Sequence, residues 1–166
     1  PGPPPPDSRS IIAVVGGRPL VVEPVGYRRD AALRLGAAAA LGSIEQLIAA
    51  TDGRGADLVI EATNSPSGFA DAAEAAVIGG RVVVVGIPDG KQYAFEAAVP
   101  RRKQLQITFS RRMGEVLPRA IRLVAEGRLD PAAWVSHRIG LAGVPEAFAG
   151  LAAYRDGALK VVVELS

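Results

Sequence analysis

Apolar residues in this chain occur either in short continuous runs or at helical spacing. The clearest run is 81–87, where four consecutive valines leave no polar face, as in a strand that is covered on both sides. Between 115 and 126 the apolar residues recur every three or four positions, which is the period of an amphipathic helix. The first pattern predicts a buried strand and the second a helix.

The same two patterns predict an alternation of elements along the rest of the chain. Strands are expected at 20–23, 37–41, 56–63, 81–87, 92–99, 105–109 and 160–165, and helices at 27–35, 43–51, 66–78, 115–126 and 144–154. Residues 8–17 fit a helix that ends at two glycines, and the β-branched run 11–15 also fits a strand. Such alternation predicts the α/β fold class, with a doubly wound parallel sheet.

Composition allows one domain and removes several kinds of function. A chain of 166 residues that is 49% hydrophobic can bury a single core. The chain has no cysteine and one histidine, which excludes disulfides, thiolate chemistry and His-rich or Cys-type metal sites within it. Its apolar runs fall far short of the roughly 20 residues of a membrane span, and its start lacks the order of a signal peptide. A cytoplasmic protein with no membrane partner is expected.

The positive charge of the chain is scattered. The formal net charge is +2 and the pI is near 9.3, values that raise the question of nucleic acid. However, the basic residues are spread along the chain, and the clusters 101–103 and 111–112 are typical of solvated loops. No nucleic-acid partner is therefore expected.

Glu23 is the residue that points to a function. It closes the apolar run 20–22 and follows Gly2 at about the 20-residue spacing of a dinucleotide-binding motif. An acidic side chain at the end of a strand, at this distance from a glycine turn, is where such a fold holds an adenosine ribose. The alternative is that Glu23 ends a strand in solvent.

Several stretches keep one order along the chain. They are Leu-Val-Val-Glu-Pro at 20–24, the segment 51–62 that ends in Leu-Val-Ile-Glu-Ala, Gly-Gly-Arg-Val-Val-Val-Val-Gly at 79–86, Trp-Val-Ser-His-Arg at 134–138, Pro-Glu-Ala-Phe at 145–148 and Gly-Ala-Leu-Lys-Val-Val at 157–162. Together they resemble the zinc-containing medium-chain dehydrogenase family, which includes alcohol, sorbitol and threonine dehydrogenases. The resemblance covers only the second half of such an enzyme. It implies that residues 1–166 form a single NAD-binding Rossmann-type domain with a C-terminal segment, and that the N-terminal catalytic domain is absent from this chain.

The resemblance also implies which residues contact the adenosine side of the cofactor. In that family NAD or NADP lies at the carboxyl edge of the sheet. Glu23 and Arg28 correspond to positions at the ribose, and Ala62 and Thr63 flank the adenosine side. A carboxylate accepts hydrogen bonds from free ribose hydroxyls and repels a 2′-phosphate, so NAD is favoured over NADP. Lys160 falls where a cation reaches the pyrophosphate, although it could equally be a surface lysine.

On the nicotinamide side, the resemblance implies four further cofactor-binding residues. Gly86 and Ile87 correspond to backbone groups that hold the carboxamide, and Thr108 and Ser110 lie near the ring. Ordinary packing at strand ends is an equally good interpretation of these four.

The start of the chain departs from the family pattern. Gly2 falls on the second glycine of Gly-x-Gly-x-x-Gly and Pro5 on the third. The prolines at 3–6 have no amide hydrogen to offer a pyrophosphate. The strand before this turn would be central in the order 3-2-1-4-5-6, and without it two half-sheets expose unpaired edges. An upstream half, the run 11–15 or a second chain could supply it, and we favour the first.

The function implied by the resemblance is the oxidation of a small alcohol or polyol by hydride transfer to NAD, in a homodimer that pairs near the strand at 92–99. A catalytic zinc would be held by the upstream half, because no residue here matches a zinc ligand or a catalytic position. The chain alone is therefore expected to be inactive. Two alternatives remain open: a zinc-free NADPH quinone or enoyl reductase of the same superfamily, and a degenerate Rossmann-like scaffold without catalysis.

Several conspicuous side chains are expected to be structural. His137 lies outside the segments that carry zinc or proton-relay positions in the family, and Trp134 is expected to serve packing and not as a platform for the cofactor. Asp52, Asp57 and Glu61 are interpreted as loop and strand-edge charges, because their spacing does not pair carboxylates for acid–base work.

Overall fold

The computed structural model describes residues 17–88, 92–111 and 116–165. Gly2, the prolines and the run 11–15 lie outside these residues. The chain divides into two compact units. We call residues 1–42 with 117–166 the terminal unit, and residues 43–116 the middle unit.

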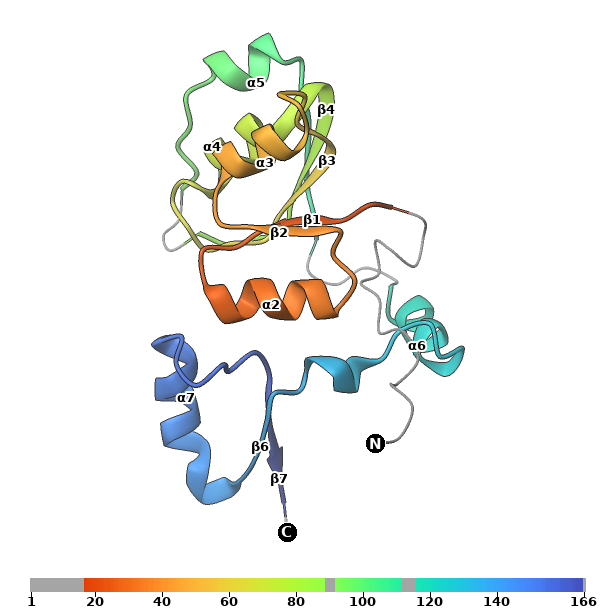
Figure 1. The fold of residues 1–166 in the computed structure, drawn as a ribbon, viewed down its shortest axis with the longest axis vertical. Coiled ribbons are helices and arrows are strands. Elements are labelled where there is room, and N and C mark those ends of the chain that lie inside the picture. The colour runs from red at the N-terminus through yellow and green to blue at the C-terminus, as the bar shows by residue number, and fades with distance from the viewer. Residues whose placement is uncertain (1–16, 89–91, 112–115, 166) are drawn as a thin grey trace. The chain divides into compact units, whose positions relative to one another are not determined.

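The terminal unit contains a parallel β-α-β motif, as the sequence predicted. Strand β1 (Leu20–Val22), helix α2 (Gly26–Arg34) and strand β2 (Ala39–Leu41) follow one another, and Leu20 lies opposite Ala39 in a parallel register. The Glu23 amide extends this ladder by donating to the Leu41 carbonyl oxygen at 2.9 Å. Helix α2 runs alongside the two strands (Figure 1) and buries Ala31.

A second parallel pair lies near the end of the chain. The terminal unit continues with α6 (Leu117–Ala125), the 3₁₀ turn η1 (Pro131–Trp134), β6 (His137–Gly140), the 3₁₀ turn η2 (Leu141–Gly143), α7 (Val144–Ala152) and β7 (Val161–Glu164). Strands β6 and β7 pair in parallel. The helices and β7 were predicted. Strand β6 was not predicted, because its segment has no apolar run and its strand structure depends on pairing with β7.

The middle unit is a three-stranded parallel sheet with helices. Its elements are α3 (Ile44–Ala50), β3 (Ala56–Glu61), α4 (Gly68–Ala75), β4 (Ala76–Val84), α5 (Ala98–Arg102) and β5 (Gln106–Phe109). The sheet order is β3-β4-β5. The Ser43 hydroxyl caps α3 by accepting from the Gln46 amide at 3.4 Å, as the sequence predicted.

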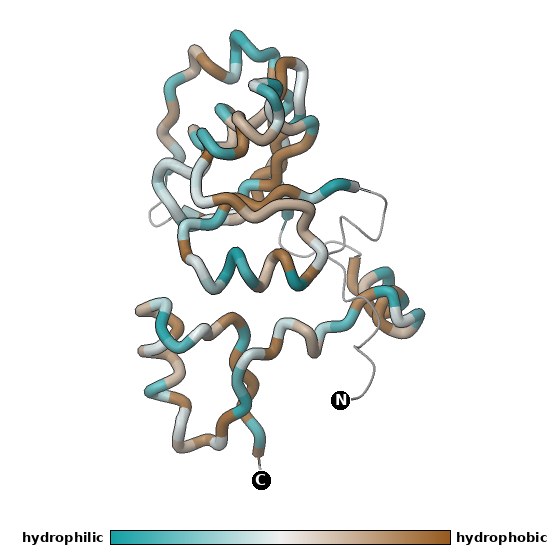
Figure 2. The backbone as a smooth tube through the Cα atoms, in the orientation of Figure 1, coloured by the Kyte–Doolittle hydropathy of each residue, from teal (hydrophilic) through white to brown (hydrophobic). Residues whose placement is uncertain are grey.

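The core of the middle unit lies where α4 packs on the sheet. It consists of Phe69, Ala72, Ala76, Val82 and Val84, with Val59, Tyr93, Leu105 and Ile107 packed against it. In Figure 2, brown stretches follow the strands of this sheet. Burial on both faces, expected for the valine run, is only partial. Val82 and Val84 are buried, but Leu58 and Ile60 on the neighbouring strand are 44% and 45% exposed, because α4 covers one face.

Two sequence predictions for the middle unit are wrong. The helix expected at 66–78 ends at Ala75, and 76–78 belong to β4, which suits the β-branched pair Val77 and Ile78. The strand expected at 92–99 does not form: residues 92–97 have no regular structure. Their alternating apolar residues face the core instead, since the Phe95 ring stacks on Phe69 with centroids 4.3 Å apart. The sheet edge expected to pair two chains is therefore not formed by these residues.

Lys103 also differs from expectation. The cluster 101–103 was interpreted as solvated loop charge, yet the Lys103 ammonium donates to three carbonyl oxygens at the end of α4. They are those of Ala73 at 3.1 Å, Glu74 at 2.6 Å and Ala76 at 3.0 Å. The lysine is thus the C-terminal cap of that helix.

Among the described strands, β1-β2 and β3-β4-β5 form separate sheets. Every strand pair is parallel within the described ranges.

Candidate cofactor-binding site

A pocket of about 410 Å³ lies within the terminal unit. Three of the predicted site residues line it, namely Glu23, Arg28 and Lys160. The other lining residues are Ala31, Ala32, Leu35, Trp134 and Leu159. Trp134, which was expected to serve packing, lines this pocket and is 36% exposed. The pocket therefore joins one carboxylate and two cations to an apolar wall.

One carboxylate oxygen of Glu23 accepts from a backbone amide, and the other lies near Arg28. Oε1 accepts from the Val25 amide at 2.9 Å, at the turn that leads into α2. Oε2 lies 3.9 Å from a terminal nitrogen of Arg28, and the Glu23 side chain is 23% exposed. This carboxylate is held at the end of β1 and lines the pocket, as the ribose prediction requires.

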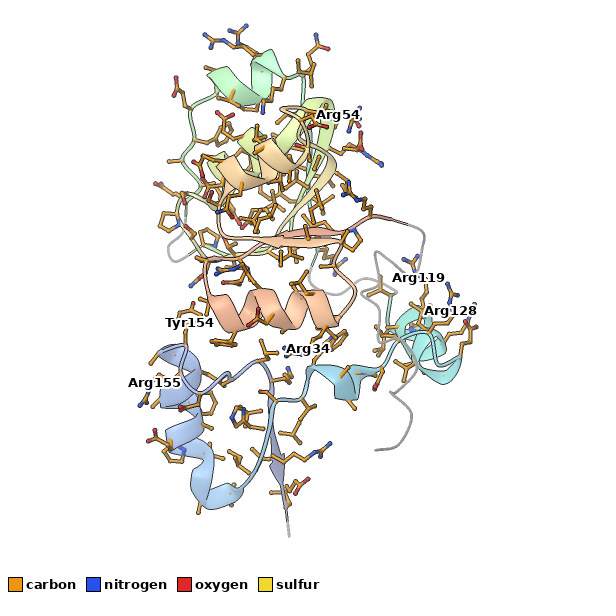
Figure 3. All side chains as sticks on the ribbon, in the orientation of Figure 1. Arg34, Arg54, Arg119, Arg128, Tyr154 and Arg155 are labelled. Atoms are coloured by element: carbon orange, nitrogen blue, oxygen red, sulfur yellow. The ribbon has the colours of Figure 1, made fainter. Side chains whose placement is uncertain are left out.

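Arg28 is held by aromatic rings. The centre of its guanidinium group lies 4.6 Å from the ring centroid of Tyr154 and 6.0 Å from that of Tyr27, distances typical of cation–π contacts. Tyr154 follows α7 (Figure 3). The Arg28 Nε is buried and has no hydrogen-bond partner among the described residues. An unpaired buried donor at a pocket wall fits an oxygen-rich ligand.

Arg29 differs from Arg28 although it is the next residue. It donates to the carbonyl oxygens of Glu23 at 2.8 Å and Pro24 at 2.7 Å. It thereby fixes the turn between β1 and α2. Both bonds use the same terminal nitrogen of the Arg29 guanidinium.

Ser136 holds the backbone of Lys160. The Ser136 hydroxyl accepts from the amides of Leu159 at 2.9 Å and Lys160 at 3.2 Å, and donates to the Lys160 carbonyl oxygen at 3.0 Å. His137 Nδ1 lies 2.9 Å from the same hydroxyl. Because the backbone engages this hydroxyl, the Ser-His pair serves the β6–β7 junction and matches no nucleophile–base arrangement.

Replacing Ser136 by alanine is expected to lower the free energy of unfolding by about 1 kcal/mol, because exposed hydrogen bonds contribute modestly. Urea denaturation followed by circular dichroism measures the change. Ser110→Ala is the matched control, since within the described ranges that hydroxyl makes one 3.5 Å contact, with the Arg111 carbonyl oxygen. Equal stability of the two variants would contradict the role given to Ser136.

The middle unit brings the other predicted residues to one sheet edge. Because β3, β4 and β5 are parallel, their carboxyl ends lie on the same side. The Gly86 amide donates to the Glu61 carbonyl oxygen at 3.0 Å, and the Ser110 amide to that of Val84 at 2.8 Å. The predicted residues at or just past this edge are Ala62, Thr63, Gly86, Ile87, Thr108 and Ser110.

Glu61 is a feature of this edge that sequence reasoning missed. It is not a strand-edge charge, because it is only 5% exposed. Oε1 accepts from the amide and the hydroxyl of Thr63 at 2.7 and 2.6 Å, and Oε2 has no hydrogen-bond partner in the described part of the chain. An acid that directly follows Leu58-Val59-Ile60 was the signal that it could be buried.

Asp57, by contrast, behaves as predicted. It is exposed and pairs with Arg54, which is labelled in Figure 3. The hydrogen bond from Arg54 and its positive charge lower the pKa of the Asp57 carboxyl below its ordinary value.

Two features are missing from the described residues: a cluster of metal ligands and a membrane-spanning helix. No three His, Cys, Asp or Glu side chains of residues 17–88, 92–111 and 116–165 gather closely enough to hold a metal ion, so these residues do not fit a zinc centre. In the same ranges no helix has the length and apolar character needed to cross a membrane.

Comparison with known proteins gives the family. L-arabinitol 4-dehydrogenase of Hypocrea jecorina is 32% identical over 108 residues, which are 64% of this chain and 28% of that enzyme. The structure of alcohol dehydrogenase TADH from Thermus sp. ATN1 is 26% identical with a TM-score of 0.79, and that of an NAD-dependent alcohol dehydrogenase is 26% identical with a TM-score of 0.77. Both alignments cover 94% of this chain, but 47% and 46% of those structures.

The chain thus has the α/β Rossmann-type fold of alcohol dehydrogenases and spans about half the length of the solved structures it matches. The sequence model for zinc-binding dehydrogenases matches residues 10–126. Since these residues make up well over half of the chain, it belongs to the zinc-binding dehydrogenase family.

Proposed function

We propose that this chain is the cofactor-binding part of an NAD-dependent dehydrogenase that oxidises a small alcohol or polyol by hydride transfer. The observation that carries the proposal is the Glu23 carboxylate, held at the end of β1 on the wall of a pocket. The similarity to an NAD-dependent alcohol dehydrogenase supports the cofactor, and the similarity to L-arabinitol 4-dehydrogenase supports the alcohol class. The nicotinamide of bound NAD supplies the acceptor for the hydride that leaves the alcohol carbon.

In the terminal unit, each polar pocket residue has a role in this proposal. Glu23 Oε2 accepts hydrogen bonds from the ribose hydroxyls. Arg28, held by its two tyrosines, offers its unpaired Nε to a ligand oxygen, and the exposed ammonium of Lys160 pairs with a phosphate. The apolar wall with Trp134 accommodates a flat ring. This chemistry favours a free 2′-hydroxyl, because a 2′-phosphate would be repelled by Glu23.

In the middle unit, the carboxyl edge of the sheet is proposed to contact the cofactor through residues around its strand ends. Ala62 and Thr63 would serve the adenosine side, and backbone groups at Gly86 and Ile87 the nicotinamide carboxamide. The helix α4 begins close to this edge, at Gly68. The sheet edge of wound α/β folds is the general place for such ligands.

The proposal is tested by titrating the purified chain with NADH and NADPH and following nicotinamide fluorescence. NADH should bind more tightly. Glu23→Ser should reduce the preference for NADH about tenfold, the worth of one or two hydrogen bonds to a charged group. Asp30→Ser is the matched control, since Asp30 is an exposed carboxylate on α2, the helix that follows Glu23, and should leave the ratio unchanged.

The other outcomes separate the alternatives. A preference for NADPH in the unmodified chain would favour a zinc-free reductase, and no binding of either cofactor would favour a non-catalytic scaffold. A homodimer remains a prediction from the resemblance. Light scattering of the purified chain measures it, and a monomer would contradict it.

A further inference from the structure

The peptide between Gly86 and Ile87 is held at its carbonyl oxygen. The Tyr93 hydroxyl donates to the Gly86 carbonyl oxygen at 2.7 Å. No described group accepts from the Ile87 N–H, and residue Ile87 is 62% exposed. Just past the carboxyl end of β4, this peptide therefore has one polar group engaged and another without an acceptor among the described residues.

The Tyr93 ring cannot easily leave this position. Its centroid lies 6.1 Å from that of Phe69 and 5.7 Å from that of Phe109, with tilted planes. The side chain is partly buried against the core of the middle unit. Aromatic contacts at these distances are favourable, so the hydroxyl is held by packing as well as by its hydrogen bond.

Residues on the other side of Gly86 are fixed as well. The amides of Val85 and Gly86 donate to the Glu61 carbonyl oxygen at 2.8 and 3.0 Å. The end of β4 is thus tied to β3 on one side and to Tyr93 on the other. Rotation of the Gly86-Ile87 peptide would have to break the Tyr93 bond.

In a trans peptide the carbonyl oxygen and the following N–H point in opposite directions. By holding the Gly86 oxygen, Tyr93 sets the direction of the Ile87 N–H. We infer that Tyr93 is a positioning residue, which aims the Ile87 N–H as a donor to the carboxamide oxygen of nicotinamide. The inference rests on the proposed function. It refines that function because the Gly86 carbonyl oxygen already has a partner, which leaves the Ile87 amide as the group that contacts the ligand.

The test compares NADH with ADP-ribose, which lacks the nicotinamide. In Tyr93→Phe the ring remains and only the hydroxyl is lost. The dissociation constant for NADH should rise about three- to tenfold, as for one well-placed hydrogen bond, and that for ADP-ribose should stay within about twofold. Tyr27→Phe is the matched control. It removes a 3.1 Å bond from a tyrosine hydroxyl to the Ala158 carbonyl oxygen, and should leave the ratio of the two affinities unchanged.

A second measurement does not depend on the variant. In the ¹⁵N-labelled chain, the Ile87 amide signal should shift on addition of NADH and not of ADP-ribose. Two outcomes would overturn the inference: an Ile87 signal that shifts with neither ligand, or an equal loss of both affinities in Tyr93→Phe. The proposed function would stay intact in either case, provided that the unmodified chain still binds both ligands. If the unmodified chain binds neither, the proposed function fails and the inference with it.

Discussion

Replacing Gly86 by alanine is expected to lower the free energy of unfolding by about 3 kcal/mol, at the upper end for overpacking. A Cβ atom at this position would lie against the Thr63 carbonyl oxygen, 2.5 Å from Glu61 Oε2 and 2.8 Å from the Thr63 nitrogen. Two of these three atoms are backbone and cannot rotate away. The third belongs to a buried carboxylate whose other oxygen is held by Thr63.

Urea denaturation of the purified chain, followed by circular dichroism, measures this loss. Gly140→Ala is the control, because a Cβ there would meet no atom within 4 Å and its φ of −76° suits alanine. The control should unfold at the same urea concentration as the unmodified chain. A Gly86→Ala variant as stable as the control would show that the ends of β3 and β4 are less closely packed than described.

This glycine illustrates which parts of the fold the sequence could predict. Four consecutive valines made the strand before Gly86 evident, and Gly86 itself suggested where that strand ends. What the sequence could not show is that the missing side chain makes room for Thr63 and Glu61, which are more than 20 residues away. Close approach of two backbones depends on the register of the sheet and not on a local pattern.

The same distinction holds for the candidate site. The place of Glu23 at a strand end could be predicted, because an apolar run and the acid that closes it are local in sequence; its role at a ribose stays a prediction. The burial of Glu61 had one local signal, the apolar run before it, but its bonds to Thr63 and the Tyr93 bond to Gly86 had none in the sequence, because they depend on tertiary packing. The error at 92–99 has this origin too. Alternating apolar residues are typical of a strand, but here Phe95 stacks on Phe69 and its segment does not join the sheet.

Lys103→Met is expected to lower the free energy of unfolding by about 2 kcal/mol. The last carbonyls of a helix have no partner within it, and here the ammonium group satisfies those of Ala73, Glu74 and Ala76. Methionine preserves the length and apolar stem of the side chain but donates no hydrogen bond. Hydrogen bonds to charged groups are worth about 1.5–3 kcal/mol, and the Lys103 side chain is only 23% exposed, so solvent weakens them little.

The matched control is Arg102→Met, one residue earlier, at the end of α5. Arg102 is exposed and the structure gives it no hydrogen bond or ion pair with a described residue, so its loss should change stability by less than about 0.5 kcal/mol. Lys103→Arg should recover little, because a planar guanidinium cannot converge on three carbonyls as a compact ammonium does. If Lys103→Met and Arg102→Met unfold at the same urea concentration, the ammonium does not cap α4. The boundary between α4 and β4, at Ala75 and Ala76, must then be set by the β-branched residues that follow it.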